Sequence, residues 1–259
     1  MSGFLFHETV FGPVMSRRLG VSLGINLLPV DYKYCTFNCI YCECGWTHDK
    51  AGGSKELPAR NTVSSKLEEK LRIMQKDGQV PDAITFAGNG EPTIHPEFPE
   101  IIEDTIHLRD RYFPDTRVTV LSNASMLHRE EIFNALKAID DNIQKLDAGS
   151  DKMFQLINQP AGKLKLEKIV EQLGRFSGNL IIQTLFLRGM HNGHAVDNTT
   201  DEEIGQWISH LKKIQPEYVM IYPIDRSTPE QDIEKISFEE LSEIAKKVNN
   251  EGINIKVFG

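Results

Sequence analysis

All four cysteines of this 259-residue chain lie within ten residues of one another, and this clustering constrains the fold more than any other feature. Cys35, Cys39 and Cys42 form a C-x3-C-x2-C run, CTFNCIYC, and Cys44 follows two residues later. A disulfide framework spreads its cysteines to join distant loops, and structural zinc takes two separated ligand pairs. A tight triplet instead favours an iron–sulfur cluster, in which three thiolates bind three irons of a [4Fe–4S] cube and the fourth iron stays open.

Segments of strand and helix character alternate along the rest of the chain. Apolar runs predict strands at residues 22–28, 82–86, 118–121, 142–146, 180–187, 218–222 and 253–257. Apolar residues at three- to four-residue intervals predict helices at residues 62–76, 98–111, 128–138, 164–176, 200–214 and 237–249, the first capped by Thr62 or Ser64. This alternation implies right-handed crossovers and a parallel sheet. The expected fold class is α/β: a partial (β/α)6 barrel, with helices flanking a parallel sheet that has a possible seventh strand.

This fold is expected to form a single domain over residues 1–259, with a lead-in at residues 1–20 and the cysteine loop at residues 35–42. In parallel α/β folds the chemistry lies at the carboxyl ends of the strands. The candidate positions there are Gly88, Asn89, Gly90 and Glu91 after the second strand, Asn123 after the third, Lys145 and Asp147 at the fourth, Gln183 in the fifth and Tyr222 at the sixth.

Some of these positions have two interpretations. The glycines let the backbone approach a ligand closely, whereas Glu91 is also compatible with an ordinary turn carboxylate. Lys145 and Asp147 share one face of their strand, where they form either a structural ion pair or part of a substrate site.

Several further polar residues have open roles. The paired charges of Arg17 and Arg18 fit either a solvated turn or a contact with an anionic group of substrate or cofactor. Arg188, at the end of the fifth strand, is a further candidate to clamp a carboxylate or phosphate. Cys44 is compatible with a free thiol, a redox sensor or a neighbour of the cluster.

Two segments are predicted to be loops. Residues 48–60 are polar and contain glycines, so an exposed loop is expected, in which His48 is not a ligand. Residues 189–198 are predicted to form a mobile loop at the mouth of the site, with His191 and His194 as loop residues rather than catalysts.

Two motifs carry a family resemblance. CTFNCIYC resembles the cysteine loop of radical S-adenosylmethionine (radical SAM) enzymes, and TFAGNGEPTIHP resembles their GGEP-type motif, with Asn89 in place of a glycine. The resemblance implies that Cys35, Cys39 and Cys42 hold a [4Fe–4S] cluster whose open iron chelates SAM. One-electron reduction would then cleave SAM to methionine and a 5′-deoxyadenosyl radical, which abstracts hydrogen from a substrate. The implied SAM-binding residues are Tyr41, Gly88, Asn89, Gly90, Glu91, Asn123, Gln183 and Tyr222.

The segments SRRLG, KYCTFNCIYCECG and KLDAGS also resemble the group related to wyosine-forming tRNA enzymes. Those enzymes hold a second cluster on three N-terminal cysteines, whereas no cysteine precedes Cys35 here. The substrate is therefore left open as a small molecule, RNA or peptide. Lys145 and Asp147 are the candidate catalytic residues, and Lys145 could form a Schiff base with a carbonyl substrate.

The leading hypothesis is a radical SAM enzyme whose substrate the sequence does not identify. The alternatives are a tRNA-base-modifying enzyme of wyosine-like type, a protein- or peptide-modifying activase, and a non-enzymatic iron–sulfur electron-transfer protein. The hypotheses in which the protein is an enzyme imply an external electron donor such as flavodoxin or ferredoxin.

The net charge is −8, and the segment from Asp197 onward contains 13 acidic and 7 basic residues, so no basic stripe suited to a nucleic-acid backbone is visible. No signal-like or membrane-spanning apolar stretch is present, and a cytoplasmic protein without membrane contact is expected.

Overall fold

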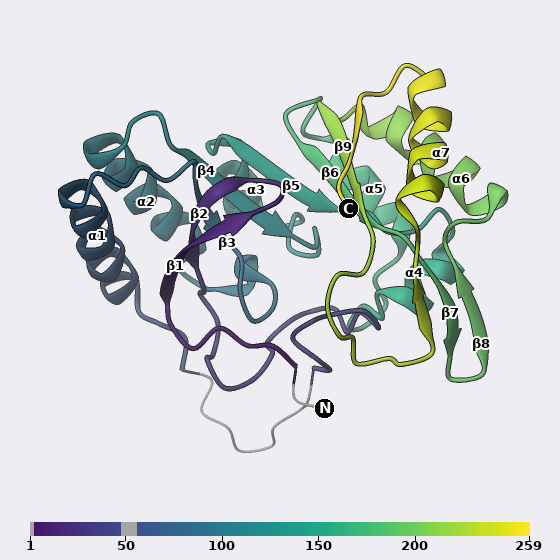
Figure 1. The fold of residues 1–259 in the computed structure, drawn as a ribbon, viewed down its shortest axis with the longest axis horizontal. Coiled ribbons are helices and arrows are strands. Elements are labelled where there is room, and N and C mark those ends of the chain that lie inside the picture. The colour runs from purple at the N-terminus through teal and green to yellow at the C-terminus, as the bar shows by residue number, and fades with distance from the viewer. Residues whose placement is uncertain (1–2, 48–55) are drawn as a thin grey trace.

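The computed structural model describes residues 3–47 and 56–259, so His48 and most of the predicted loop around it lie outside the described residues. Seven parallel strands form the centre of the fold: β2 (Gly20–Ile25), β3 (Ala83–Phe86), β4 (Arg117–Ser122), β5 (Asp141–Lys145), β6 (Ile181–Leu185), β9 (Tyr218–Tyr222) and β11 (Ile255–Val257). They are adjacent in this order, and β1 (Val10–Ser16) adds an antiparallel edge strand beside β2. The sheet stays open, as expected for a partial barrel, and the possible seventh parallel strand is confirmed (Figure 1).

Helices join successive parallel strands and flank the sheet (Figure 1). They are α1 (Arg60–Lys76), α2 (Phe98–Tyr112), α3 (Glu130–Lys137), α5 (Leu166–Gly174), α6 (Asp201–Ile214) and α7 (Phe238–Asn250). Each agrees with its predicted range to within two residues. The predicted cap of α1 is wrong, because the helix begins two residues earlier, after Ala59, and the first-turn amide of Arg60 donates to the Glu97 carboxylate at 3.3 Å.

A seven-residue helix, α4 (Asp151–Ile157), was not predicted. The Ser150 side chain caps it by accepting a hydrogen bond from the amide of Met153 at 3.1 Å. A buried carboxylate, that of Glu203 in α6, in turn accepts from the amides of Gly149 and Ser150 at 2.9 and 3.0 Å. The turn that leads into α4 is thus fixed by a residue about fifty positions away.

The prediction of a mobile loop at residues 189–198 is wrong. This segment forms β7 (Leu187–His191) and β8 (His194–Asp197), which make a small antiparallel sheet with β10 (Ile233–Lys235). Asn192 and Gly193 occupy its two-residue turn with φ of 49° and 77°, the conformation that Asn-Gly hairpins favour. His191 is buried and its Nδ1 lies 2.6 Å from a Glu230 carboxylate oxygen, so it is not a loop residue.

Asn198 attaches this small sheet to the main one. Its buried side-chain amide donates to the backbone carbonyls of Asp147 and Leu185 at 2.7 and 2.8 Å and accepts from the amide of Leu187 at 2.8 Å.

Among the helices of residues 3–47 and 56–259, none combines the length and the apolar character that a bilayer crossing requires.

Replacing Asn198 by alanine should lower the free energy of unfolding by about 3 kcal/mol, because three buried backbone groups lose their partner. Urea unfolding measures the change. Asn134→Ala, at an exposed position of α3, is the matched control and should change stability by less than about 0.5 kcal/mol. Equal losses in the two variants would contradict this role for Asn198.

Candidate active site

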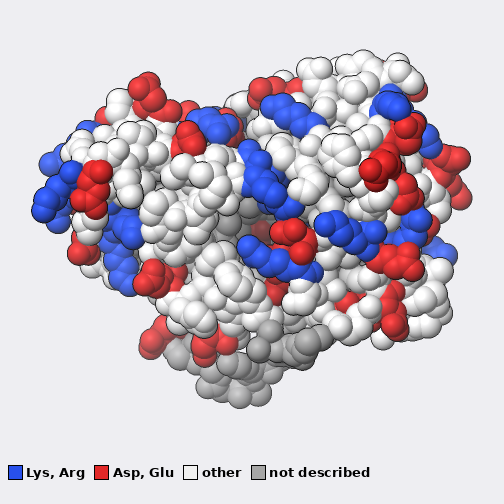
Figure 2. Space-filling model, viewed as in Figure 1, with Lys and Arg blue, Asp and Glu red and all other residues white. Residues whose placement is uncertain are grey.

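The carboxyl ends of the parallel strands surround a cavity of about 380 Å³, a size typical of small-molecule sites. It is lined by all four cysteines, by the ends of β3 to β6 and β9, and by residues 223–226. Charged side chains of both signs border its mouth (Figure 2). The positions predicted from the strand ends therefore converge on one space, except for Asn89 and Asp147, which do not line it.

Backbone hydrogen bonds hold the cysteine loop against two neighbours. The amide of Tyr34 donates to the carbonyl of Asn89 at 2.8 Å, and the amide of Glu91 donates back to the carbonyl of Tyr34 at 3.2 Å. Further along, the amide of Ile40 donates to the carbonyl of Ile157, the last residue of α4, at 3.0 Å. The loop is thus fixed to the glycine-rich turn on one side and to α4 on the other.

The sulfur atoms of this loop suit a cluster better than a single metal ion. All four cysteines are free. Across the described ranges, no three His, Cys, Asp or Glu side chains converge on a position where they could hold one ion. A [4Fe–4S] cube does not need such convergence, since each thiolate binds a different iron.

A buried lysine balances the charge of these thiols. Lys33 donates from Nζ to the carbonyl of Gly45 at 3.1 Å. Burial alone would lower its pKa, but the charges of Cys42, Cys39 and Cys35 outweigh burial and raise the pKa. The hydrogen bond from Cys44, together with Lys33, lowers the pKa of Cys42 to about 5, whereas burial raises the pKa of Cys35 to about 12. A cation fixed beside the loop favours the thiolate forms that bind metal.

The glycine-rich turn after β3 packs against the chain itself. A side chain at Gly88 would place its Cβ 2.3 Å from the Asn26 side-chain oxygen, and one at Gly90 would lie 1.8 Å from the carbonyl oxygen of Tyr34. Both glycines line the cavity. Gly90 is therefore required for the close approach of this turn to the cysteine loop, and Gly88 for its close approach to Asn26.

Asn89, which replaces a glycine of the motif, does not line the cavity. Its buried side chain donates to the carbonyls of Phe6 and Pro29 at 2.9 and 2.7 Å and accepts from the amide of Phe6 at 2.8 Å. The structure thus places Asn89 in the scaffold behind the site, joining the lead-in segment to the turn.

Glu91 is buried between the ends of β3 and β4. Its carboxylate accepts from the amide of Thr93 at 3.1 Å, from the Thr93 hydroxyl and from the amide of Asn123 at 2.6 Å. Burial raises the pKa of Glu91 more than these hydrogen bonds lower it. Asn123 in turn donates to Thr36 Oγ1 at 2.9 Å and to the sulfur of Cys35 at 3.5 Å, so it contacts the cysteine loop directly.

Tyr41, Lys145 and Asp147 form one buried network. The Tyr41 hydroxyl donates to the Asp147 carboxylate, and Lys145 Nζ donates to the Tyr41 oxygen at 2.6 Å while lying 3.5 Å from the carboxylate. Asp147 also accepts from the Asn158 side chain at 2.7 Å and from the amide of Leu185 at 3.0 Å. Tyr41 and Lys145 line the cavity, whereas Asp147 lies behind it.

The environment of Lys145 favours its protonated form. Burial alone would lower the pKa of Lys145, but the charge of Asp147 together with those of the neighbouring tyrosine and cysteine groups outweighs burial and raises the pKa. A lysine that attacks a carbonyl must be unprotonated. The structure shows Lys145 Nζ 3.5 Å from the Asp147 carboxylate as an ion pair, and a catalytic role of the two residues stays a prediction.

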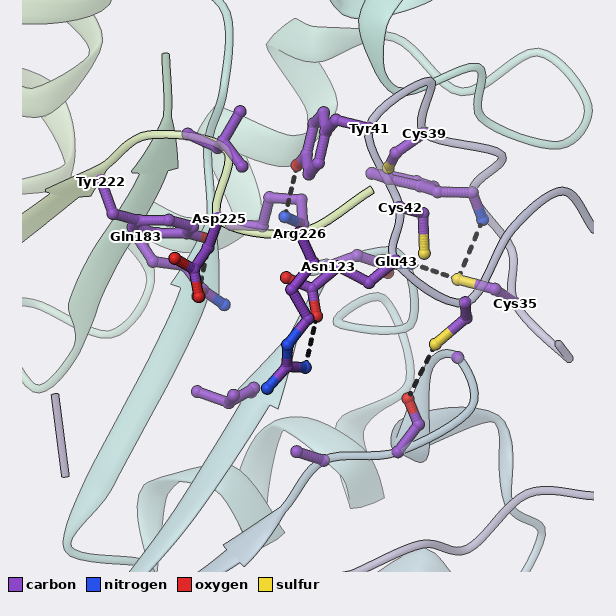
Figure 3. A pocket seen from close by; sticks show the side chains of 18 of the residues that line it. Cys35, Cys39, Tyr41, Cys42, Glu43, Asn123, Gln183, Tyr222, Asp225 and Arg226 are labelled. Atoms are coloured by element: carbon purple, nitrogen blue, oxygen red, sulfur yellow. Dashed lines mark hydrogen bonds and ion pairs between the residues drawn. The ribbon is translucent and has the colours of Figure 1, made fainter. Parts of the chain in front are cut away.

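Gln183 and Tyr222 lie on the side of the cavity opposite the cysteines (Figure 3). The Tyr222 hydroxyl donates to Gln183 Oε1 at 3.2 Å, and Arg18 Nη1 donates to the same oxygen at 3.1 Å. Sequence reasoning did not connect these three residues, because Arg18 precedes β2 and approaches from the opposite end of the strand.

The remaining charged residues of the cavity form ion pairs at its mouth. Arg17 pairs with Asp225 at 2.9 Å, and Arg226 pairs with Glu43 at 2.7 Å (Figure 3). Arg188 does not line the cavity and pairs with a glutamate of α7 instead. The ion pair of Glu43 with Arg226 was not predicted from the sequence, since the two residues lie 183 positions apart.

Comparison with known proteins gives a consistent picture. The family model of the Radical SAM superfamily matches residues 30–211. A protein named GTPase Obg from Brachyspira hyodysenteriae is 31% identical over 254 residues, which are 96% of this chain and 35% of that protein. A UPF0026 protein of Methanocaldococcus jannaschii is 32% identical over 210 residues, which are 80% of this chain and 60% of that protein. The chain thus spans 35% and 60% of the length of these two relatives.

Solved structures share the fold at low identity. A radical SAM methyltransferase from Sphaerobacter thermophilus has a TM-score of 0.67 at 14% identity, covering 92% of this chain and 65% of that one. Archaeal TYW1 has a TM-score of 0.54 at 13% identity, covering 88% of this chain and 71% of that one. These likenesses concern the fold and cover 92% and 88% of this chain.

Replacing Cys39 by alanine should remove most bound iron and the brown absorbance after anaerobic reconstitution, because three protein thiolates are needed to hold the cube. Cys44→Ala is the matched control from the same loop and should keep near-normal iron content. Iron analysis and visible absorbance measure both. A full cluster in Cys39→Ala, or its loss in Cys44→Ala, would contradict the ligand assignment.

Replacing Glu91 by alanine should weaken SAM binding about tenfold or more while iron content stays near normal. The variant leaves the amides of Thr93 and Asn123 without their acceptor and loosens the turn beside the cysteines. Equilibrium dialysis with labelled SAM measures the affinity. Glu97→Ala, a carboxylate at the start of α2, is the control, and equal affinity in all three proteins would remove Glu91 from the site.

Proposed function

The chain belongs to the radical SAM superfamily, and we propose that it is an enzyme that cleaves SAM reductively and abstracts hydrogen from a substrate held in the cavity. Members of this superfamily bind a [4Fe–4S] cluster and SAM. Here Cys35, Cys39 and Cys42 would hold the cluster. When bound, the reduced cluster supplies the electron that splits SAM into methionine and a 5′-deoxyadenosyl radical.

One observation supports this proposal above the others: the cysteine loop and the glycine-rich turn meet at one cavity. The reciprocal hydrogen bonds of Tyr34 with Asn89 and Glu91 fix their separation. The turn exposes backbone at Gly88 and Gly90 toward the cavity, beside the thiols. An electron-transfer protein would have no use for such a turn beside its cluster, so the arrangement favours binding of an amino-acid group such as that of SAM.

The remaining residues would prepare the site for this chemistry. Lys33 offsets the negative charge of the thiolates. Asn123 and the Gly88 to Glu91 turn would orient SAM, because both contact the cysteine loop directly. Tyr41, whose hydroxyl is held by Asp147 and Lys145, presents its ring as a fixed wall of the cavity.

The proposal is tested by anaerobic reconstitution, reduction with dithionite in the presence of SAM, and mass spectrometry of the products. Wild-type protein should form 5′-deoxyadenosine and methionine in equal amounts, since one cleavage yields both. Cys42→Ala should form neither, and Cys44→Ala should form both. Wild-type protein that carries a full cluster and binds SAM but forms neither product would overturn the proposal.

A further inference from the structure

The charges that line the cavity are unevenly neutralised. Three of its five cationic side chains pair with carboxylates, namely Arg17, Lys145 and Arg226, and a fourth, Lys33, donates to the Gly45 carbonyl beside the cysteine loop. The fifth, Arg18, makes no ion pair with any carboxylate of residues 3–47 or 56–259. A cation inside a cavity without a protein counter-charge is suited to an anion that arrives with a ligand.

Arg18 is nevertheless held in a defined orientation. Its guanidinium carbon lies 4.5 Å from the centre of the Tyr222 ring, and Nη1 donates to Gln183 Oε1 at 3.1 Å. Within the described chain this is the only hydrogen bond of a side chain that has five N–H donors. Both partners are neutral, so they orient the guanidinium and leave its charge available.

We infer that Arg18, oriented by Gln183 and Tyr222, anchors an oxyanion of a small-molecule substrate, either a carboxylate or a phosphate. The planar guanidinium matches both groups by donating two parallel hydrogen bonds. Gln183 and Tyr222, expected from the sequence to contact SAM, become part of this second subsite. The inference relies on the proposed function only in assuming that the same cavity also holds SAM.

The position of Arg18 separates this anion from that of SAM itself. In the proposed function the carboxylate of SAM binds at the cluster, beside the cysteines. Gln183 and Tyr222 lie on the opposite side of the cavity (Figure 3). A second anionic group is therefore needed to occupy the Arg18 subsite, and the substrate is the molecule that can bring it.

A small molecule fits these observations better than RNA does. The unpaired cation is one residue in a cavity of about 380 Å³, whereas Arg17 and Arg226 at the mouth are already paired with carboxylates. An RNA backbone is bound by several unpaired cations along an open surface.

The experiment measures binding of inorganic phosphate and of acetate to reconstituted protein by calorimetry at constant ionic strength. Wild-type protein should bind at least one of the two, and the one it prefers identifies the group. Arg18→Gln should bind it about tenfold more weakly or worse, because a charge-assisted hydrogen-bonded pair is lost. Arg17→Gln is the matched control and should bind as wild type does, because Asp225 already occupies that guanidinium.

The other results overturn the inference. Equal anion affinity in Arg18→Gln and wild type would do so, as would an equal loss in Arg17→Gln. If Arg18→Gln also loses iron or SAM affinity, Arg18 is a scaffold residue and the anchor role is wrong. A short single-stranded RNA bound more tightly than either anion, and weakened equally by both substitutions, would favour a polymer. Anion binding through Arg18 without any SAM cleavage would overturn the proposed function and leave this subsite standing.

Discussion

The buried carboxylate of Asp147 joins the cysteine loop to the sheet. It accepts hydrogen bonds from the loop through Tyr41, from the end of α4 through Asn158, and from the end of β6 through the amide of Leu185, and it faces Lys145. Removing a carboxylate from water costs several kcal/mol, which only a full set of donors can offset. Since each donor comes from a different element, none of them can move without leaving the charge short of a partner.

Glu91 and Glu203 are two further buried carboxylates whose charge is stabilised by hydrogen bonds from more than one segment of the chain. Glu91 joins the ends of β3 and β4 through Thr93 and Asn123, and Glu203 joins the turn before α4 to α6. Asp147 and Glu91 follow strands β5 and β3, and Glu203 of α6 reaches the turn after β5; in each case the carboxylate accepts from backbone amides that have no sheet partner. Acidic residues at strand ends, which look like catalysts in a sequence, therefore also serve as internal supports that fix the walls of a cavity.

The parallel sheet and its six long helices were predictable because their signal is local periodicity. The small sheet of β7, β8 and β10 was missed because residues 189–198 were predicted to be a mobile loop, although Asn192-Gly193 is a hairpin signal. Helix α4 was missed because seven residues carry too little periodicity. The role of Asn89 could not be predicted from the sequence, because its hydrogen-bond partners Phe6 and Pro29 lie 83 and 60 residues away in the chain.

Arg17 and Arg18 show most clearly what folding adds to sequence. The two residues are adjacent in the chain and chemically identical, but they bind different partners. Arg17 pairs with the carboxylate of Asp225 at the mouth of the cavity, whereas Arg18 contacts the neutral side chains of Gln183 and Tyr222 inside it. The cavity consequently has thiols on one side and, beside Gln183 and Tyr222 on the other, a single guanidinium without a carboxylate partner. A ligand anchored by its anionic end at Arg18 would present its opposite end to the cysteine side. Such a cavity selects its substrate by the distance between an oxyanion and a reactive C–H bond, whatever chemical group lies between them.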